Sequence, residues 1–228
     1  MKNCHSENSR DSQDSCHSER SEESRFGSHA TLSQPQLENI STYIDLLLRW
    51  NARINLTGIR QSEEIVTRHF GESLFTARHL FPAGVRTEQS SAQSLTDLGS
   101  GAGFPALPIK IWAPEIALTL IESNQKKATF LREVARALTL TNVNVFSGRA
   151  EHYSSPSAQV VTLRAVERFE SILLTATNLV APKGRLALLI SKAQLATAES
   201  LSPTFTWTPA KPVPLSSSRI LAIGIREP

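Results

Sequence analysis

Asp97-Leu98-Gly99-Ser100-Gly101-Ala102-Gly103-Phe104-Pro105 joins a short apolar run to the start of a helical pattern. Its three glycines stand at alternate positions, where the missing Cβ atoms let the backbone turn sharply and approach a ligand closely. Pro105 suits the first turn of a helix, because its fixed φ is helical and no N–H partner is needed there. The segment therefore predicts a strand-to-helix turn that holds a ligand against its backbone.

Short apolar runs alternate with helical runs around and beyond this turn. The predicted strands are residues 95–98, 117–121, 143–146, 160–163, 186–190 and 219–225, and the predicted helices are residues 105–112, 124–138 and 168–180. This alternation is typical of an α/β fold with a mostly parallel sheet covered by helices on both faces. The last run has no helix after it and is expected to insert antiparallel. Ligands of such sheets bind at the carboxyl ends of the strands.

The glycine spacing separates two classes of cofactor. A dinucleotide fingerprint needs a third glycine where this chain has Phe104, so a dehydrogenase is disfavoured. The spacing is instead that of the glycine loop of S-adenosylmethionine-dependent methyltransferases. Glu122 follows Gly99 by 23 residues at the end of the next predicted strand, where a carboxylate accepts hydrogen bonds from both ribose hydroxyls. The alternative for Glu122 is a helix cap near residue 124.

A third candidate contact is Arg149-Ala150-Glu151, which follows the third predicted strand. This is the height at which an adenine edge is contacted in such folds, and a plain surface turn is the alternative.

Two helices are predicted before the sheet, over residues 35–52 and 62–80, because apolar residues recur there at three- and four-residue spacing. Residues 50–58 join them without a clear period. They form either a turn whose Asn side chains bind backbone groups or a surface that helps to close a site. The predicted division is a disordered tail over 1–30, an N-terminal helical segment over 31–86 and a methyltransferase domain over 87–228.

Composition limits the functions that are possible. The 228 residues are 40% hydrophobic and 20% charged, which is typical of a globular protein, and no apolar run reaches the roughly 18 to 20 residues needed to cross a bilayer. We expect a soluble, cytoplasmic protein without membrane contact. Both cysteines, Cys4 and Cys16, lie in the polar tail, so we expect no metal site, disulfide or cysteine nucleophile in the folded part. Residues 31–228 carry a net charge of +5, which is compatible with a polyanionic partner.

The chain resembles the bacterial RsmG (GidB) family, the guanine-N7 methyltransferases of small-subunit ribosomal RNA. The resemblance covers about residues 35–228. It rests on Trp50-Asn51 to Asn55-Leu56-Thr57, Arg68-His69, the 97–105 segment, Leu120-Ile121-Glu122-Ser123 with Lys126-Lys127 and Phe130-Leu131, Arg149-Ala150-Glu151, and Arg164-Ala165. The implied fold is a Rossmann-like class I S-adenosylmethionine-dependent methyltransferase preceded by helices.

The implied reaction is transfer of the methyl group of S-adenosylmethionine to guanine N7 at position 527 of 16S rRNA. The partner is then 16S rRNA or the small ribosomal subunit, and the protein is expected to act as a monomer. The cofactor-binding residues expected from the loop spacing and the resemblance together are Gly99, Gly101, Gly103, Phe104, Glu122, Ala150, Glu151 and Arg164.

The chain departs from the family pattern at four positions. Glu72 stands where the family usually has Asp, Ala106 where it has Gly, Leu163 where it has Ser, and Ala193 where it has Gly. The changes at Glu72, Ala106 and Leu163 keep open the alternative of a non-catalytic rRNA-binding assembly factor. A second alternative is a methyltransferase acting on a small molecule, since the same cofactor-binding half could serve such an acceptor.

Guanine N7 has an in-plane lone pair and carries no proton, so its methylation needs no general base and the enzyme's task is positioning. We therefore expect no acid–base catalytic residue, with Arg164 as an orienting donor, since a guanidinium does not deprotonate. RNA contact is expected from phosphate neutralisation. The RNA-binding candidates are Arg53, Arg68, His69, Lys126 and Lys127.

Overall fold

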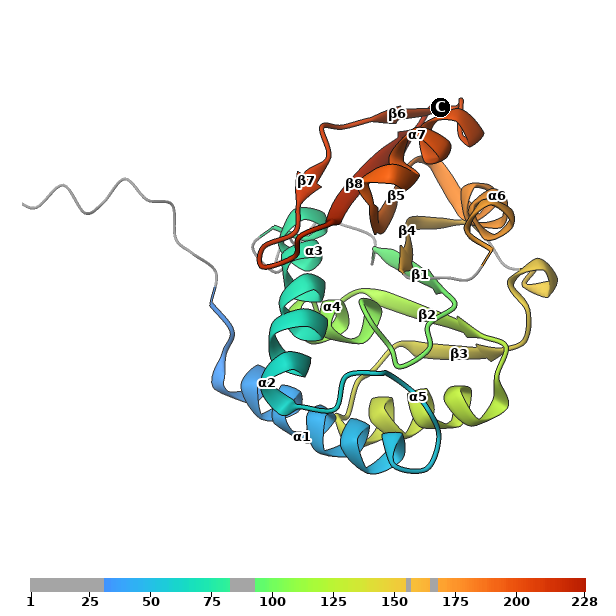
Figure 1. The fold of residues 1–228 in the computed structure, drawn as a ribbon. Coiled ribbons are helices and arrows are strands. Elements are labelled where there is room, and N and C mark those ends of the chain that lie inside the picture. Colours follow the sequence, from blue (N-terminus) through green and yellow to red (C-terminus); the bar gives the residue numbers. More distant parts are fainter. Residues whose placement is uncertain (1–30, 83–92, 155–156, 165–167) are drawn as a thin grey trace, which may run out of the picture. The chain divides into compact units, whose positions relative to one another are not determined.

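The computed structural model describes residues 31–82, 93–154, 157–164 and 168–228, and its centre is one mixed sheet (Figure 1). The strand order is β3-β2-β1-β4-β5-β8-β6, and β7 pairs with β8. All neighbouring pairs from β3 to β5 in this order are parallel. β8 is antiparallel to β5, as the sequence predicts for the last run. The strands are β1 (Ser94–Leu98), β2 (Ala117–Glu122), β3 (Val143–Ser147), β4 (Ala158–Arg164), β5 (Val180–Ser191), β6 (Phe205–Trp207), β7 (Lys211–Pro212) and β8 (Arg219–Arg226).

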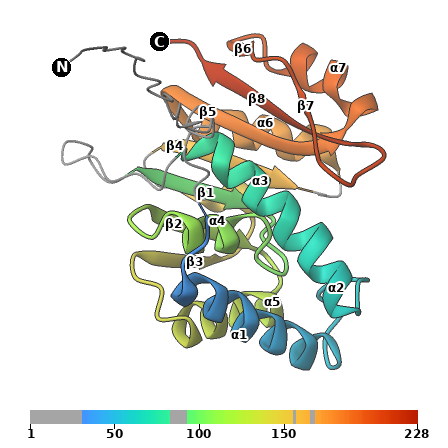
Figure 2. The same ribbon diagram turned by 90° about the vertical axis from the view of Figure 1, so that its left-hand side faces the viewer.

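Helices cover both faces of the sheet (Figures 1 and 2). One hydrophobic cluster joins α1, α3, α4 and α5 to one face, and a second joins α6 and α7 to the other. None of the helices in the described ranges is long and apolar enough to cross a membrane. The helices are α1 (Gln34–Asn51), α2 (Ser62–Glu64), the π-helix η2 (Ile65–Phe70), α3 (Gly71–Leu80), α4 (Ala106–Trp112), α5 (Gln125–Ala137), the 3₁₀ turn η3 (Ala150–His152), α6 (Phe169–Leu179) and α7 (Lys192–Leu201).

Strand β5 shows why the sheet strands are near-continuous apolar runs. Leu186, Leu188 and Ile190 belong to the cluster under α6 and α7, whereas Ala187 and Leu189 belong to the opposite one. Successive side chains point to opposite faces, and both faces are covered over residues 186–190, so this part of the strand is continuously apolar. β1 lies between β2 and β4 in this buried sheet. The strands that follow β1 in the chain are added first on its β2 side and then on its β4 side.

The predicted α/β fold class is confirmed, including the helices that precede the sheet. One strand and one helix differ from prediction: the strand expected to start at residue 186 starts at Val180, and the helix over 62–80 keeps its bounds but is π-helical in its middle. Four elements, the 3₁₀ turn η3, α7, β6 and β7, were not predicted. β6 and β7 have only 3 and 2 residues, and α7 buries only Ala198 fully. None of these three elements therefore gives a strong hydrophobic period in the sequence.

The predicted division of the chain stays a prediction. The tail over 1–30 lies outside the described residues, and so does most of the stretch that precedes β1. Within the described part, α1 and α3 share one hydrophobic cluster with the sheet.

Candidate active site

A cavity of about 560 Å³ lies where β1, β2 and β4 end. Because β1 is the strand at which the sheet order reverses, this is the position expected for a ligand of an open α/β sheet. The cavity is lined by Leu56, Thr57, Ile59, Arg68, His69, Gly99, Ser100, Gly101, Ala102, Phe104, Glu122, Ser123, Asn124, Lys127, Arg164, Ile172 and Arg219.

The glycine loop forms one wall. Gly99, Gly101 and Gly103 have positive φ values of 66°, 56° and 88°, a conformation that L-residues with a Cβ rarely adopt. At Gly103 an added Cβ would also lie 2.5 Å from Cδ1 of Leu107 and would collide with the hydroxyl of Tyr43. Gly103 is thus required by packing behind the loop, whereas Gly99 and Gly101 face the cavity.

Helix α1 holds this loop from behind through Tyr43. Its hydroxyl donates to the carbonyl of Ala102, and its ring stacks on Phe104 with centroids 5.3 Å apart and planes within 2°. The ring of Phe70 meets both in edge contacts. The side chain of Tyr43 is fully buried, and burial raises the pKa of its hydroxyl well above the usual value. The hydroxyl therefore remains a donor to the loop.

Glu122 ties the loop to the next helix. Its Oε2 accepts from the N–H of Gly101 at 2.8 Å, and its Oε1 accepts from the N–H of Asn124 at 2.7 Å. The side chain of Asn124 in turn caps α5 by accepting from the N–H groups of Lys126 and Lys127. Each carboxylate oxygen can accept a further bond. Both interpretations offered by the sequence are therefore compatible with this geometry.

An ion-pair cluster forms the opposite wall. Oε2 of Glu72 lies 2.7 Å from a guanidinium nitrogen of Arg164 and 2.7 Å from one of Arg219. Glu72 and Arg164 are almost fully buried, with 4% and 7% of their side chains exposed. Burial is the main cause that lowers the pKa of Arg164, to about 10, so it stays protonated at neutral pH.

His69 links this cluster to the loop between the first two helices. Its Nδ1 lies 3.1 Å from a guanidinium nitrogen of Arg164, and its Nε2 lies 2.8 Å from Oγ1 of Thr57. Its ring stacks on Phe104 at 4.6 Å. Burial first, and the neighbouring guanidinium groups second, lower the pKa of His69 to about 3. The imidazole is therefore neutral at physiological pH.

Asp97 lies beneath the loop at the end of β1. Its Oδ1 accepts from the hydroxyl of Thr162 at 2.6 Å, and within the described residues Oδ2 has no partner. Complete burial raises the pKa of this carboxyl to about 7, although the hydrogen bonds from Thr162 and Ser100 oppose the shift. Asp97 therefore titrates near neutral pH.

The structure brings together most of the residues predicted for the site. Gly99, Gly101, Phe104, Glu122 and Arg164 line the cavity, as do Arg68, His69 and Lys127. Five other predicted residues do not line it. Gly103 is buried behind the loop, Ala150 and Glu151 lie in η3, Arg53 is exposed after α1, and Lys126 is exposed at the start of α5. The binding roles of all these residues stay predictions.

Sequence reasoning did not single out Tyr43 or Arg219, and it named Thr57 only as part of the motif that carries the resemblance. Thr57 lies in the 50–58 segment, for which a role in closing the site was one of two alternatives. The other alternative is also observed, because the Asn51 side chain bonds the backbone of Leu56 and Thr57. Arg219 pairs with Glu72, which lies 147 residues earlier in the sequence. A contact between residues so far apart leaves no local pattern in the sequence.

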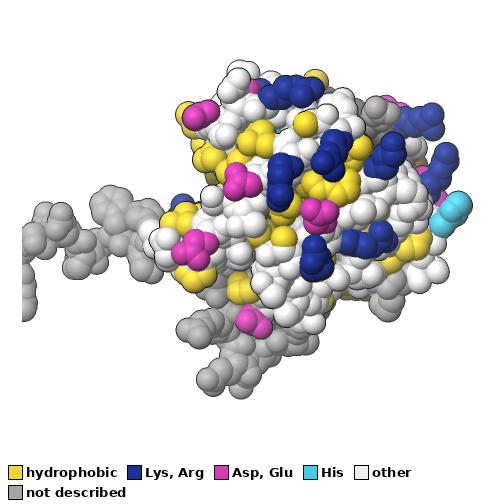
Figure 3. Space-filling model, turned by 90° about the horizontal axis from the view of Figure 1, so that it is seen from below, with side chains coloured by type: hydrophobic (Ala, Val, Ile, Leu, Met, Phe, Trp, Pro, Cys, Tyr) yellow, Lys and Arg dark blue, Asp and Glu magenta, His cyan; other side chains and the backbone are white. Residues whose placement is uncertain are grey.

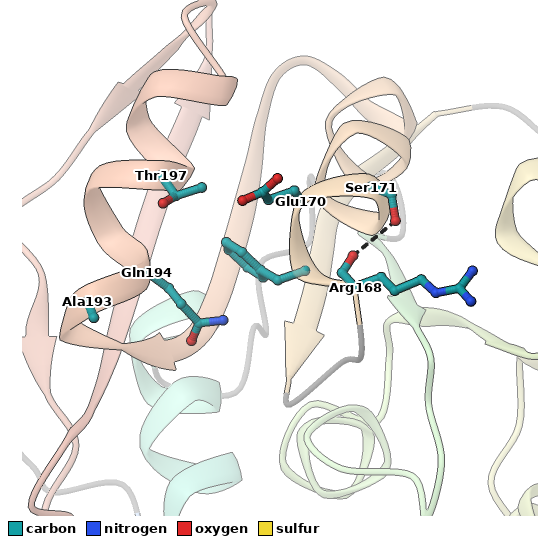
Figure 4. A pocket seen from close by; sticks show the side chains of 7 residues that line it. Arg168, Glu170, Ser171, Ala193, Gln194 and Thr197 are labelled. Carbon is teal, nitrogen blue, oxygen red and sulfur yellow. Dashed lines mark hydrogen bonds between the residues drawn. The ribbon is translucent and has the colours of Figure 1, made fainter.

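A second cavity, of about 540 Å³, lies between α6 and α7 (Figure 4). Its wall includes Arg168, Glu170 and Ser171 on one side and Gln194 and Thr197 on the other, and the Ser171 hydroxyl donates to the Arg168 carbonyl at 3.0 Å. Neither the glycine loop nor any residue predicted for the site lines it. The glycine-loop cavity is therefore the candidate active site.

Basic side chains gather on the molecular face that carries α1 and α5 (Figure 3). Lys and Arg side chains lie close together there, with a few acidic groups among them. Helix α5 begins beside the cavity, since Asn124 and Lys127 belong to its lining. A polyanion bound on this face would thus reach the cavity rim.

Comparison with known proteins agrees with this site. The family model described as rRNA small subunit methyltransferase G matches residues 36–218. A protein of Chloroflexus aggregans named ribosomal RNA small subunit methyltransferase G is 40% identical over 166 residues, which cover 68% of this chain and 66% of that protein. A protein of the same name from Halorhodospira halophila is 40% identical over 158 residues, or 69% of this chain and 71% of that protein. In a Streptococcus pyogenes relative the match covers only 59% of the protein, so the chain spans somewhat less than two thirds of the length of some curated relatives.

Solved structures share the fold at low identity. The YcgJ protein of Bacillus subtilis superposes with a TM-score of 0.56 at 12% identity, covering 70% of this chain and all of that one. TYW2 of P. horikoshii, solved in complex with MeSAdo, gives a TM-score of 0.56 at 11% identity and covers 70% of this chain and 63% of that one. At such identities the likeness shows the fold alone.

Proposed function

The chain belongs to the rRNA small subunit methyltransferase G family, and from this we propose that it transfers the methyl group of S-adenosylmethionine to guanine N7 at position 527 of 16S rRNA. The family membership confirms S-adenosylmethionine as the cofactor expected from the sequence. One observation carries the assignment of the site. A single cavity joins the glycine loop and Glu122 to Arg164 and His69, so a donor and an acceptor can meet there.

The residues on the donor side fit this cofactor. The bare backbone of Gly99 and Gly101 leaves room for close approach, and the free lone pairs of Glu122 match two ribose hydroxyls. Phe104 lines the cavity at the boundary with the acceptor side, where its ring is fixed by stacking with Tyr43 and His69. Ala150 and Glu151 are proposed to meet the adenine edge. When bound, S-adenosylmethionine supplies an electrophilic methyl group on a sulfonium centre.

The residues on the acceptor side position a base and do not move protons. Guanine N7 attacks with its own lone pair, so no base is required. Arg164 is held between Glu72 and His69 and has only N–H donors to offer. His69 is neutral and already engaged at both ring nitrogens. We therefore assign Arg164 an orienting role.

The RNA backbone is proposed to contact the basic face of α1 and α5 and the cavity rim. Arg53, Lys126 and Lys127 lie on or beside these helices, and Arg68 and His69 lie on η2. The positive charges of Arg53, Arg68, Lys126 and Lys127 would neutralise phosphates, whereas His69 is neutral and would supply no charge. We also propose that the protein acts in the cytoplasm and as a monomer. Light scattering of the purified protein checks whether it is a monomer.

Methyl transfer from labelled S-adenosylmethionine tests the proposal directly. The acceptors to compare are small ribosomal subunits isolated from cells without this activity, naked 16S rRNA and small-molecule acceptors. We expect label in 16S rRNA as N7-methylguanine at a single position. Label in a small acceptor only, or cofactor binding with no transfer to either form of rRNA, would instead favour the two alternatives raised by the sequence.

Calorimetry with S-adenosylmethionine tests the role of Glu122. We expect Glu122→Gln to weaken cofactor binding about tenfold, because charged hydrogen bonds to the ribose become neutral ones. Glu115→Gln is the matched control, since Glu115 is exposed between α4 and β2. Unchanged affinity in a folded Glu122→Gln variant would remove Glu122 from the cofactor site.

A further inference from the structure

Thr57 is held in place through almost every polar atom that it has. Its N–H donates to Oδ1 of Asn51 at 3.0 Å, and its carbonyl accepts from Nδ2 of Asn51 at 2.9 Å. Its Oγ1 lies 3.2 Å from the donating N–H of Ile59 and 2.8 Å from Nε2 of His69. The side chain lines the candidate active site. Such a residue presents one fixed arrangement to a ligand.

The direction of the bond between His69 and Thr57 is set by Arg164. A guanidinium carries only N–H donors, so Nδ1 of His69 must accept the bond from Arg164 at 3.1 Å. The neutral ring then carries its proton on Nε2 and donates it to Oγ1 of Thr57. The ion pair between Arg164 and Glu72, at 2.7 Å, holds the guanidinium in this position.

Thr57 therefore differs from an ordinary hydroxyl residue. A threonine hydroxyl has one donor hydrogen and two acceptor lone pairs, and it normally rotates to donate or to accept as its partner requires. Here both lone pairs are used, by the N–H of Ile59 and by His69. Among the described residues no acceptor is recorded for the hydroxyl hydrogen. Thr57 can only donate.

We propose that Thr57 is a specificity-determining residue whose hydroxyl donates a hydrogen bond to O6 of the target guanine. The inference rests on the proposed function. Guanine presents two acceptors on the edge that contains N7, namely N7 and O6, whereas adenine presents N7 and an amino donor. A donor at O6 leaves the N7 lone pair free to attack. Against adenine the same hydroxyl would face a second donor, and with its lone pairs occupied it cannot turn round to accept.

The test uses small subunits reconstituted with 16S rRNA that carries guanine, inosine or 2-aminopurine at the target position. Inosine keeps O6 and N7, whereas 2-aminopurine keeps N7 and lacks O6. The parent enzyme should act on inosine as on guanine and lose about tenfold in kcat/KM on 2-aminopurine, a loss typical of one buried hydrogen bond. This comparison needs no variant, so it holds even if a Thr57 variant folds poorly.

Measuring the Thr57 variants on the same three target bases gives a double-mutant cycle between the hydroxyl of Thr57 and O6 of the base. Thr57→Val keeps the shape and removes the hydroxyl, and we expect it to lose about tenfold on guanine and inosine but less than twofold on 2-aminopurine. Thr57→Ser should stay within about twofold of the parent on every base. Thr67→Val is the matched control, since the Thr67 hydroxyl donates to the Glu63 carbonyl on the exposed surface.

Three outcomes would overturn the inference. Thr57→Val could lose the same factor on guanine and on 2-aminopurine, which indicates a structural role alone. It could lose nothing on guanine, or the parent could treat 2-aminopurine and guanine alike. A parent enzyme that transfers no methyl group to guanine subunits, while binding S-adenosylmethionine, would overturn the proposed function and this inference together.

Discussion

The two walls of the candidate active site are built in opposite ways. The donor wall consists of the glycine loop and Glu122, which lie within one β-loop-α-β unit and act largely through backbone N–H groups and bare glycine positions. The acceptor wall consists of side chains alone, from Thr57, His69, Glu72, Arg164 and Arg219. These come from a loop, two helices and two strands of the described fold. The donor wall is determined by residues that are close together in the sequence. The acceptor wall forms only when side chains from distant segments meet in the folded chain.

The same contrast concerns charge. On the donor wall the carboxylate of Glu122 is balanced by neighbouring N–H groups. On the acceptor wall one carboxylate, that of Glu72, balances two guanidinium groups. Removing one partner should therefore harm the acceptor wall more than the donor wall.

The largest effect is expected for Glu72→Gln. Loss of the charge leaves Arg164 buried without a countercharge, and breaking a buried pair in this way costs about 3 to 5 kcal/mol of unfolding free energy. Glu64→Gln is the matched control, because its pair with Arg68 lies on the surface with about half of each side chain exposed, and such pairs contribute less than about 0.5 kcal/mol. Urea unfolding measures both, and equal losses would contradict the contrast.

The next effect tests the glycine loop. Gly103→Ala should cost about 3 kcal/mol, because the new Cβ meets Leu107 and Tyr43 and φ is 88°. Gly101→Ala should cost about 1 kcal/mol, since its Cβ would lie 3.7 Å from the nearest atom and only the positive φ of 56° is unfavourable. Thermal unfolding and calorimetry with S-adenosylmethionine follow both. If the two variants lost the same stability, the packing argument for Gly103 would fail.

A smaller effect comes from pH and separates Asp97 from His69. The pKa of Asp97 is raised to about 7 in the fold, so its contribution to stability is complete below about pH 4 and is lost as pH rises to 7. Asp97→Asn should therefore gain about 2 kcal/mol relative to the parent between pH 5 and pH 7. The pKa of His69 is lowered to about 3, so the stability of the parent falls as the pH drops below about 6.5. Relative to the parent, His69→Gln should therefore gain stability as the pH falls, whereas Asp97→Asn gains stability as the pH rises. Unfolding at several pH values measures both slopes, and parallel slopes for parent and Asp97→Asn would refute the first.

The smallest effect concerns the basic rim. Lys126→Ala together with Lys127→Ala should weaken binding to small subunits about fivefold and lower the salt slope of the binding constant by about two, because each phosphate contact releases counterions. Lys183→Ala with Lys211→Ala is the control, because both lie on strands of the other half of the sheet. Binding measured at several salt concentrations decides, and an equal slope for parent and variant would remove these lysines from the RNA contact.

Most of the donor wall could be predicted from the sequence, although Gly103 packs behind the loop and neither Ala150 nor Glu151 lines the cavity. The spacing of Gly99, Gly101 and Gly103, and the position of Glu122 after the next strand, are local properties that a βαβ unit fixes. The acceptor wall could be predicted only as isolated candidates. Arg164 and His69 were named, but their mutual hydrogen bond was not, because a contact between residues 95 positions apart leaves no period in the chain.

By itself the sequence determined the alternation of strands and helices, the fold class and the glycine turn after β1, since these depend on hydrophobic period and backbone freedom over short distances. The tertiary structure alone decided that Tyr43 supports the loop, that Glu72 pairs with two arginines, and that the hydroxyl of Thr57 can only donate. These properties depend on which atoms meet across the fold, and on the burial that shifts the pKa values of Asp97 and His69.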